Sequence, residues 1–396
     1  MSVEADPRGL VIGDAFELTT DRTPIVARAS RSDAYAIHVV ATLPDLVERL
    51  LQAVGGAQVA VVTDETVDAL YGDLIYGELR SDGHDPIFHV LPPGERSKSL
   101  SRASALWDWL ADSDFGRRDV LIALGGGVIA DTCGWVASAY MRGVPYVNVP
   151  TTLLAQVDGA LGGKVAVNHA TAKNLIGAFH QPKAVIANIG FLRTTDPRHL
   201  RAGLAEAIKK AVIASPALFA FIEEHAEALT SGDPKALEQL VRSAAEIKTR
   251  LIERDPYEED LRRPLNFGHT IGHPLETVTG YGPLLHGEAV SFGMVAESRI
   301  AAARGLLDEE LLDRLIALLR RCGLPTAADD LRTAVAGPAI LSAMVKVRLI
   351  RAGSLRYVLP MALGRTAIVD DVAPTEVTDA LRACGVRGLS QSVASD

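Results

Sequence analysis

Two histidines four residues apart, His269 and His273, lie in the stretch RRPLNFGHTIGHPLE (residues 262–276), which ends in Glu276. On a helix, this spacing places both imidazoles on one face. Such a pair can bind one metal ion, divide between two tasks, or fill a polar gap in the interior. The spacing alone does not choose among these three roles.

Two further stretches supply a carboxylate and a third imidazole. RAGLAEAIKKAVIA places Glu206 and Lys209 three residues apart on one helix face, and LLHGEA contains His286. A glutamate and two histidines with one open position form a catalytic zinc site, in which the metal polarises oxygen atoms. The metalloprotease motif H-E-x-x-H is absent, since Thr270 occupies the position of its glutamate, so a peptidase is not expected. Four candidate ligands remain open: Glu206, His269, His273 and His286.

The segment VPTTLLAQVDGALGGKVAVNHATAKNLIGAFHQP is rich in functional side chains although it is otherwise apolar. Lysines in such surroundings need anionic partners, because burying an unpaired charge is costly. Internal salt bridges, for instance between Asp158 and Lys164, are one explanation. We favour a pocket for a phosphorylated, hydroxyl-rich molecule, because the two lysines and two asparagines exceed what one aspartate requires. The residues concerned are Asp158, Lys164, Asn168, Lys173 and Asn174.

A glycine turn lies in LIALGGGVIADTCGWVA, where a buried strand runs through residues 125–127 into a helix. Glycines at such a turn let backbone amides approach a phosphate. The turn is not the G-x-G-x-x-G fingerprint, and a tight turn without a ligand explains it equally well. However, Asp64 ends the strand VAVVTD, where an acid can hold ribose hydroxyls, and Glu95 and Lys98 follow another strand. Together, these residues at successive strand ends favour a dinucleotide.

The order of elements predicts two domains after an extension. Short β-branched runs alternate with helical segments up to about residue 190, which predicts a Rossmann-like, NAD-binding α/β domain with a parallel sheet. Beyond it, apolar residues recur at helical spacing, and only LRYVLPMALG (355–364) has the pattern of a strand. We expect an extension with one short hairpin (1–35), the α/β domain (36–190) and a mostly α-helical metal- and substrate-binding domain (191–396). A cleft between the domains is the expected ligand site.

Composition narrows the class of protein. The 396 residues are 48% hydrophobic and 22% charged, as in ordinary globular proteins. The formal charge of −9 and the lack of a Lys/Arg run argue against nucleic-acid binding. No secretion signal or membrane-spanning stretch is expected. Three widely spaced cysteines indicate buried thiols in a reducing compartment, and we predict a cytoplasmic protein.

Several sequence blocks occur together in a characteristic order: GGGVIAD, YMRGV, VPTTLLAQVDGALGGK, KNLIGAFHQP, GLAEAIKKA, LNFGHTIGH and LLHGEAV. Through these blocks the chain resembles the sugar phosphate cyclases, which include 3-dehydroquinate synthase and the heptulose-phosphate cyclases of cyclitol biosynthesis. The resemblance extends from about residue 40 to about residue 365. It implies a dehydroquinate synthase-like fold, with an NAD-binding α/β domain and a helical domain, and a homodimer.

The resemblance also implies roles for individual residues. It makes Glu206, His269 and His286 the ligands of Zn²⁺ (or Co²⁺), and it turns His273 towards the substrate phosphate. Arg142 resembles the arginine that reaches a neighbouring subunit's site. The remaining implied substrate or catalytic residues are Asp158, Lys164, Asn174, Lys209, Lys248, Arg262 and Asn266. The implied NAD-binding residues are Asp64, Glu95, Lys98, Gly126, Gly127, Asp131, Thr151, Thr152, Lys173 and Thr194.

The implied reaction is that of a carbon–oxygen lyase that eliminates phosphate. A ring hydroxyl is transiently oxidised with NAD, phosphate is eliminated, the hydride is returned, the ring opens, and an intramolecular aldol reaction closes a carbocycle. A lysine and histidine cluster would hold the phosphate dianion and then stabilise it as a leaving group.

Our choice of substrate rests on positions where this sequence differs from the dehydroquinate synthase pattern. Val347-Arg348-Leu349 stand where that enzyme carries a lysine-rich DKK, and the extension ending in SDAYAIHVVA resembles sedoheptulose 7-phosphate cyclases. Asn266, His273, Lys248 and Arg262 are nevertheless kept. We favour a secondary-metabolic cyclase that converts sedoheptulose 7-phosphate to a valiolone-type cyclitol. The alternatives are a 3-dehydroquinate or aminodehydroquinate synthase, an NAD-dependent alcohol dehydrogenase, and a non-catalytic metal-binding protein.

Overall fold

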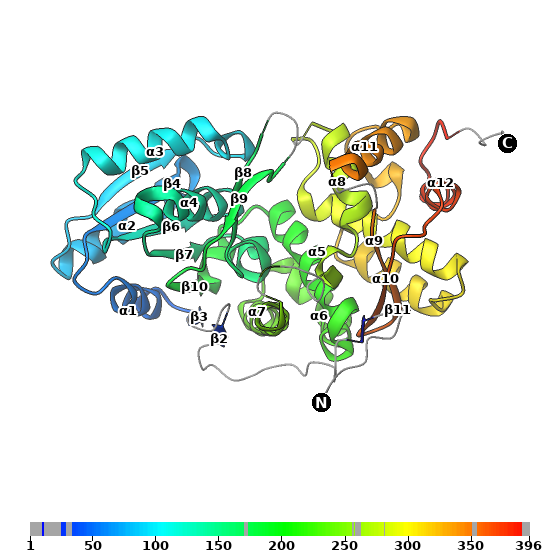
Figure 1. Ribbon diagram of the computed structural model, residues 1–396. Coiled ribbons are helices and arrows are strands. Elements are labelled where there is room, and N and C mark those ends of the chain that lie inside the picture. Colours follow the sequence, from blue (N-terminus) through cyan, green and yellow to red (C-terminus); the bar gives the residue numbers. More distant parts are fainter. Residues whose placement is uncertain are drawn as a thin grey trace. The chain divides into compact units, whose positions relative to one another are not determined.

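The computed structural model of the chain (Figure 1) describes residues 10–11, 25–28, 34–169, 173–255, 257, 263–280, 282–350 and 355–389. The chain divides into two compact units. The sheet unit comprises Thr19–Asp196 and Gly232–Tyr257. The helical unit comprises Met1–Leu18, Pro197–Ser231 and Glu258–Asp396. Among the described residues, no helix is both long and apolar enough to cross a membrane.

A seven-stranded sheet forms the centre of the sheet unit. Six of its strands run parallel to one another, namely β3, β10, β7, β6, β4 and β5. The seventh, β2, pairs with β3 in antiparallel register at the edge of the sheet. The predicted parallel sheet is therefore confirmed. The hairpin expected within residues 1–35 stays a prediction, because β3, the partner of β2, lies mainly in the predicted α/β domain. The strand order is β2 (Ile25–Arg28), β3 (Ala34–Val40), β10 (Ala184–Asn188), β7 (Tyr146–Pro150), β6 (Val120–Gly125), β4 (Val59–Asp64) and β5 (Ile87–Leu91).

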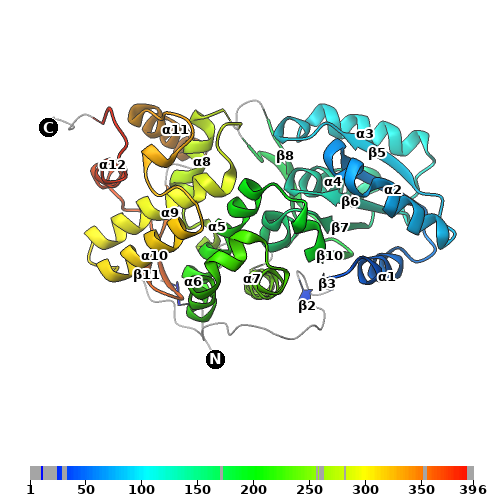
Figure 2. The same cartoon turned by 180° about the vertical axis from the view of Figure 1, so that it is seen from behind.

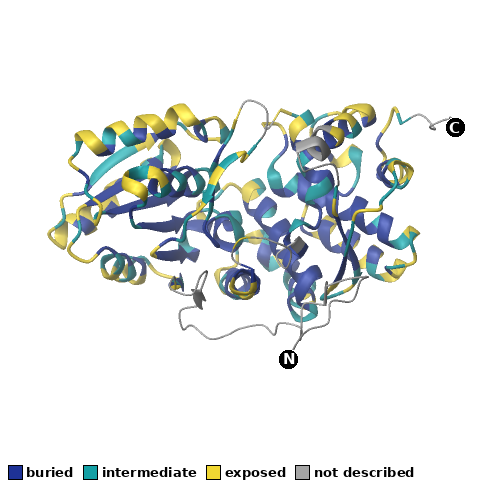
Figure 3. Cartoon of the chain, in the orientation of Figure 1, coloured by how far each residue is buried: buried dark blue, intermediate teal, exposed yellow. Residues whose placement is uncertain are grey.

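Helices cover both faces of this sheet, as the alternation of side chains along β6 shows. Leu121 and Ala123 of β6 pack with the helices α3 (Leu100–Asp112) and α4 (Gly127–Ala139). Ile122 and Leu124 point to the opposite face and pack with α1 (Leu43–Val54) and α2 (Glu65–Ser81). Accordingly, α4 lies in front of the sheet in Figure 1 and α2 in front in Figure 2. Burial on both faces explains the continuous apolar runs of the central strands, which Figure 3 shows in dark blue.

A fifth helix, α7 (Pro234–Arg254), returns to the sheet unit after two helices of the other unit. Its Ala245 packs against Tyr35, Ile37 and Val185, and its Arg242 donates a hydrogen bond to the carbonyl of Val39 at 2.7 Å. The sequence predicted a domain boundary near residue 190, whereas the chain passes into the helical unit at Pro197. The 3₁₀ helix η4 (Ile189–Arg193) lies between these two positions. The sequence placed residues 232–257 in the helical domain, and this part of the prediction is corrected. The 21-residue helix has the same periodic pattern whichever core it packs on.

The other elements of the sheet unit are short. A two-stranded ribbon of β8 (Lys164–Val167) and β9 (Ile176–Phe179) follows the π-helical turn η3 (Ala155–Gly159). Two 3₁₀ helices, η1 (Glu95–Ser97) and η2 (Tyr140–Arg142), follow β5 and α4. Four of the polar residues predicted for NAD and substrate lie in these short elements, namely Glu95, Arg142, Asp158 and Lys164.

The helical unit contains α5 (Pro197–Ala214), α6 (Pro216–Ser231), α8 (His269–Val278), α9 (His286–Ala303), α10 (Glu309–Arg321), α11 (Gly337–Ile350) and α12 (Pro374–Ala383). Two 3₁₀ helices, η5 (Arg263–Asn266) and η6 (Ala328–Asp330), connect them. The predicted strand near the C-terminus is β11 (Tyr357–Ala362). It pairs with β12 (Arg365–Val369), which in turn pairs with β1 (Leu10–Val11); the sequence prediction missed both partners.

Candidate active site

Three side chains from three helices meet in the helical unit. They are Glu206 from the middle of α5, His269 at the start of α8 and His286 at the start of α9, and their ligand atoms lie within 4.8 Å of one another. The Nε2 atoms of both histidines lie 3.6 Å from Oε1 of Glu206. Ligands about 2.0–2.1 Å from a tetrahedral zinc ion stand roughly 3.4 Å apart, so these distances fit that ion.

The second ring nitrogen of each histidine is also engaged. Nδ1 of His269 lies 3.1 Å from the carbonyl oxygen of Phe267, and Nδ1 of His286 lies 3.0 Å from Oε2 of Glu276. A hydrogen bond at Nδ1 fixes the ring so that Nε2 faces the metal, which is the usual support of a metal-binding histidine. The donor set and its orientation therefore fit Zn²⁺, and Co²⁺ accepts the same ligands.

Two glycines allow the three helix segments to approach closely. A Cβ atom at Gly287 would lie 1.9 Å from the carbonyl oxygen of Ala202 on α5, and one at Gly293 would lie 1.9 Å from that of Gly268. A larger residue at either position would push α9 away from α5 or from the start of α8. Glu297, fully buried on α9, accepts the backbone N–H groups of Gly268 at 2.8 Å and Thr270 at 3.1 Å, which fixes the first turn of α8.

Charge around the three ligands is closely balanced. Glu206 is fully buried and forms ion pairs with Lys209, one turn along α5, and with Lys210, at 3.8 Å. Burial and the Lys209 cation hold the pKa of His269 well below its ordinary value, so its ring is neutral at pH 7, as a metal ligand must be. Burial also lowers the pKa of His286, but the carboxylates of Glu276 and Glu206 outweigh it and raise this pKa to about 9.

His273 lies beside this cluster, one turn after His269. Its ring centre is 4.9 Å from that of His269 and 5.8 Å from that of His286. His273, Glu276 and His286 form a second set of possible ligands that shares His286 with the first. The sequence pattern drew attention to Glu276 but did not predict a role for it. Nothing in the sequence pointed to Glu297, because 29 residues separate it from Gly268.

In the sheet unit, the glycine turn has the expected shape. Strand β6 ends at Gly125 and α4 begins at Gly127, with Gly126 as a cap that offers no side chain. A Cβ atom at Gly126 would lie 3.2 Å from Cγ2 of Thr152, so these two predicted residues are neighbours. The first amides of α4 are thus bordered by glycine, which fits a phosphate at a helix start. Thr151 donates its N–H to the carbonyl of Gly125 at 3.0 Å.

Asp64 and Thr194, both predicted for NAD, also have structural contacts. Asp64 caps α2 by accepting the N–H groups of Thr66 at 3.0 Å and Val67 at 3.1 Å. The hydroxyl of Thr194 lies 2.5 Å from that of Tyr71. Asp64 therefore holds a helix start at the end of β4, the position where a ribose-binding acid was expected.

Six of the residues singled out in the sequence form one polar network across η1, α4 and the segment joining β8 to β9. Buried Lys98 contacts Asp131 and Asn174, while Glu95 lies 3.5 Å from Lys173. Asn168 links the two groups, since it donates to Glu95 at 2.8 Å and accepts the N–H of Asn174 at 2.9 Å. Burial raises the pKa of Asp131, although Lys98 opposes it.

Asp158 has a partner that the sequence did not suggest. Lys248 of α7 lies 3.1 Å from Oδ1 of Asp158 and donates to its carbonyl oxygen at 2.6 Å. Ninety residues separate the two, so no local spacing could have paired them. Lys164 begins β8, and Asn266 ends η5 in the helical unit. Arg262 lies outside the described residues.

Arg142 lies in a strained turn. Met141, Arg142 and Gly143 have φ values of +49°, +67° and +117°, and both non-glycine side chains are exposed. A left-handed backbone costs energy for residues with a Cβ atom, and such strain often marks functional loops.

Comparisons with known proteins identify the family. Residues 88–202 match the family described as 3-dehydroquinate synthase N-terminal, and residues 203–346 match the one described as 3-dehydroquinate synthase C-terminal. The chain belongs to the 3-dehydroquinate synthase family. The predicted resemblance and fold are confirmed, and the chain is a sugar phosphate cyclase.

Three relatives of the chain are informative. It is 52% identical to a 2-epi-valiolone synthase from Actinosynnema mirum over 95% of its own length and 98% of the relative. It is 40% identical to a 3-dehydroquinate synthase from Desulforamulus reducens over 87% of its length and 95% of that protein. Among solved structures, ValA (2-epi-5-epi-valiolone synthase) from Streptomyces hygroscopicus subsp. jinggangensis 5008, with NAD⁺ and Zn²⁺ bound, matches with a TM-score of 0.82 and 32% identity, covering 90% of this chain and 98% of ValA.

Proposed function

We propose that the chain converts sedoheptulose 7-phosphate into a valiolone-type cyclitol and inorganic phosphate, with NAD and Zn²⁺ (or Co²⁺) as cofactors. One observation carries the choice of substrate: the 52% identity to a 2-epi-valiolone synthase over nearly the whole of both chains. The identity of 40% to a 3-dehydroquinate synthase is clearly lower. By this comparison, 2-epi-valiolone is the preferred product.

At the metal, Glu206, His269 and His286 act as ligands, and the bound ion supplies electrostatic stabilisation to oxygen atoms of the substrate. Glu276 holds the ring of His286, since their side chains lie 3.0 Å apart. Lys209 is paired with Glu206 in the structure, and we assign its ammonium group to the substrate phosphate.

For the dinucleotide, we assign the pyrophosphate to the start of α4 at Gly126 and Gly127, and the ribose to Asp64. Bound NAD supplies a transient oxidation that makes the neighbouring C–H acidic. The polar network of Lys98 orders the surrounding loops. The further NAD residues are Glu95, Lys98, Asp131, Thr151, Thr152, Lys173 and Thr194.

For the substrate, we assign its phosphate to cationic and amide groups, which hold a dianion and stabilise it as it leaves. Asp158 and Lys248, already paired with each other, bind hydroxyls. The phosphate residues are Lys164, Asn174, Lys209, Asn266 and His273, and Arg262 is proposed for the distal end of the substrate.

The proposal also covers the enzyme class, the assembly of the protein and its location. The elimination of phosphate places the enzyme among carbon–oxygen lyases. We propose a homodimer in which the exposed Arg142 reaches the site of the neighbouring subunit, and the strained turn that holds it supports this role. The cytoplasmic location predicted from the sequence stays a prediction.

The experiment is turnover of two substrates by the purified full chain. With NAD⁺ and Zn²⁺ present, we expect phosphate release from sedoheptulose 7-phosphate, no steady accumulation of NADH, and a valiolone-type product by NMR. Turnover of only the carboxylated heptulose phosphate would replace our choice with a 3-dehydroquinate synthase, the second candidate. Accumulating NADH without phosphate release would indicate an alcohol dehydrogenase.

A further inference from the structure

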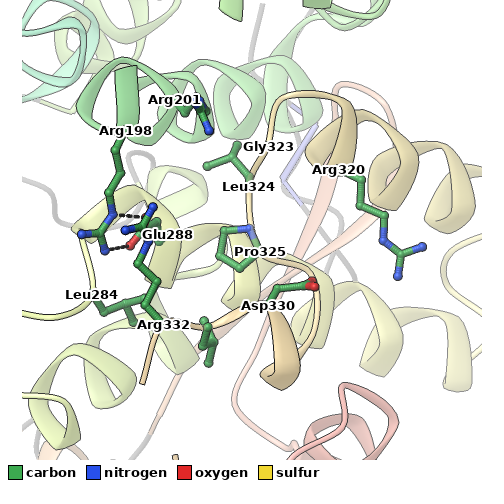
Figure 4. Close-up of a pocket in the computed structure, with 11 residues that line it drawn as sticks. Arg198, Arg201, Leu284, Glu288, Arg320, Gly323, Leu324, Pro325, Asp330 and Arg332 are labelled. Atoms are coloured by element: carbon green, nitrogen blue, oxygen red, sulfur yellow. Dashed lines mark hydrogen bonds and ion pairs between the residues drawn. The ribbon is translucent and has the colours of Figure 1, made fainter. Parts of the chain in front are cut away.

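Four of the eleven residues that line a cavity of about 380 Å³ in the helical unit are arginines (Figure 4). Its volume falls in the range of about 300–1,000 Å³ that is usual for small-molecule sites. None of the residues predicted for zinc, NAD or substrate lines it. Its charged lining residues are Arg198, Arg201, Arg320, Arg332, Glu288 and Asp330.

The two carboxylates of this cavity are already engaged. Glu288 accepts hydrogen bonds from Nε and Nη2 of Arg198, both at 2.6 Å. Asp330 accepts the backbone N–H groups of Thr326 at 2.9 Å and Ala327 at 3.0 Å. Local structure therefore uses both negative charges of the lining.

Carboxylates balance only part of the positive charge of the arginines that line the cavity. The lining contains four arginines and two carboxylates, which leaves an excess of two positive charges, although Nε of Arg320 also donates to the hydroxyl of Thr326 at 3.0 Å. Within the part of the chain that the structure describes, neither Arg201 nor Arg332 forms an ion pair with a carboxylate. Arginine keeps its charge at any pH at which the protein is folded, so the excess is permanent.

The arginines reach the cavity from three segments: Arg198 and Arg201 from α5, Arg320 from α10, and Arg332 from the loop after η6. In Figure 4, Arg198 and Glu288 lie on one side of the cavity, Arg201 lies near Gly323, and Arg320 lies on the opposite side. The backbone at Gly323 has a φ of +68°, and a Cβ atom there would lie 3.0 Å from Cδ of Arg201. Glycine at this position therefore leaves room for Arg201 beside the cavity.

We propose that this cavity binds a phosphate group, either free phosphate or a phosphate ester. Guanidinium groups bind two phosphate oxygens at once through their planar N–H groups, and the double negative charge matches the excess of two cations. This site is separate from the phosphate position of the proposed reaction, and the inference does not rest on that reaction.

The test is calorimetric titration of the zinc-loaded full chain with inorganic phosphate. Because Lys209 is proposed to bind substrate phosphate, the titration is made in a Lys209→Ala background. We expect about one phosphate to bind per chain. Introducing Arg201→Glu and Arg332→Glu together into this background should weaken phosphate binding at least tenfold. A parallel titration with glycerol 3-phosphate identifies the source: tighter binding of the ester indicates a phosphate-ester site, and equal or weaker binding indicates a site for free phosphate.

Controls separate charge from folding and from the proposed reaction. Arg118→Glu, at an exposed arginine of the sheet unit, should change phosphate affinity less than twofold. Thermal unfolding should show that the Arg201→Glu/Arg332→Glu protein is folded, and if it is not, Arg332→Gln replaces it. No binding in the Lys209→Ala background, or equal binding by the charge-reversed variant, would overturn the inference. Failure of sedoheptulose 7-phosphate turnover would sink the proposed function and leave this result unchanged.

Discussion

Nδ1 of His286 lies 3.0 Å from Oε2 of Glu276, while Nε2 of the same ring lies 3.6 Å from Oε1 of Glu206. The imidazole thus bridges two carboxylates, one that binds the metal in our account and one that orients the ring. Glu276 is 2% exposed, so water does not compete strongly for it.

Glu276→Gln should weaken zinc binding about 10- to 100-fold, because the neutral amide holds His286 less firmly in the metal-binding orientation. Competition with a chromophoric chelator measures the affinity. The control is Glu309→Gln, at an exposed glutamate of α10, which should leave the affinity unchanged. Equal zinc affinity of Glu276→Gln and the unmodified chain would show that the contact does not support the metal.

Zinc affinity should rise with pH from about 6 to about 9. The pKa of His286 is raised to about 9, so below that pH the ring carries a proton that must leave before Nε2 can bind metal. Affinity should therefore fall about tenfold for each pH unit below 9. His269, whose pKa is well below its ordinary value, adds no further dependence in this range. Affinity that is flat between pH 6 and 8 would contradict this prediction.

Glu297→Gln should flatten the dependence of stability on pH. Burial raises the pKa of Glu297 from 4.5 to about 8, against the opposing backbone N–H groups of Gly268, Ile271 and Thr270. Between these values the folded state holds a proton that the unfolded chain has lost, so stability falls as pH rises. The midpoint of thermal unfolding, measured from pH 5 to pH 8, should fall less in the variant. An unchanged slope would show that Glu297 does not titrate in this window.

Pro274→Ala should stabilise the protein. Pro274 lies inside α8 and lacks the N–H that would bond to the carbonyl of Thr270, a defect worth up to about 3 kcal/mol in a helix interior. We expect a midpoint of thermal unfolding a few degrees higher, with zinc content unchanged. A lower midpoint would mean that packing of the buried proline ring outweighs the missing hydrogen bond.

The sequence predicted the parts of the fold that local patterns encode. Apolar runs such as VAVVTD gave the parallel strands, and the spacing of Glu206 and Lys209 gave their shared helix face, which the ion pair confirms. Partners distant in the chain have no local signal. The pairing of Asp158 with Lys248 and the return of α7 to the sheet therefore required the structure.

The two histidines of HTIGH show the same limit within the site. Their spacing predicted a shared face, and the structure places both rings near that of His286. Only the three-dimensional arrangement shows that Nε2 of His269 faces Glu206. The division of their roles stays a proposal, since His273 belongs to a second possible ligand set.

The zinc content of His269→Ala and His273→Ala, measured side by side by mass spectrometry, tests the metal centre most directly. Our account predicts about one zinc ion per chain in the unmodified protein and in His273→Ala, and almost none in His269→Ala. His273→Ala should nevertheless lose turnover. Zinc retained by His269→Ala and lost from His273→Ala would contradict the account and place the metal at His273, Glu276 and His286.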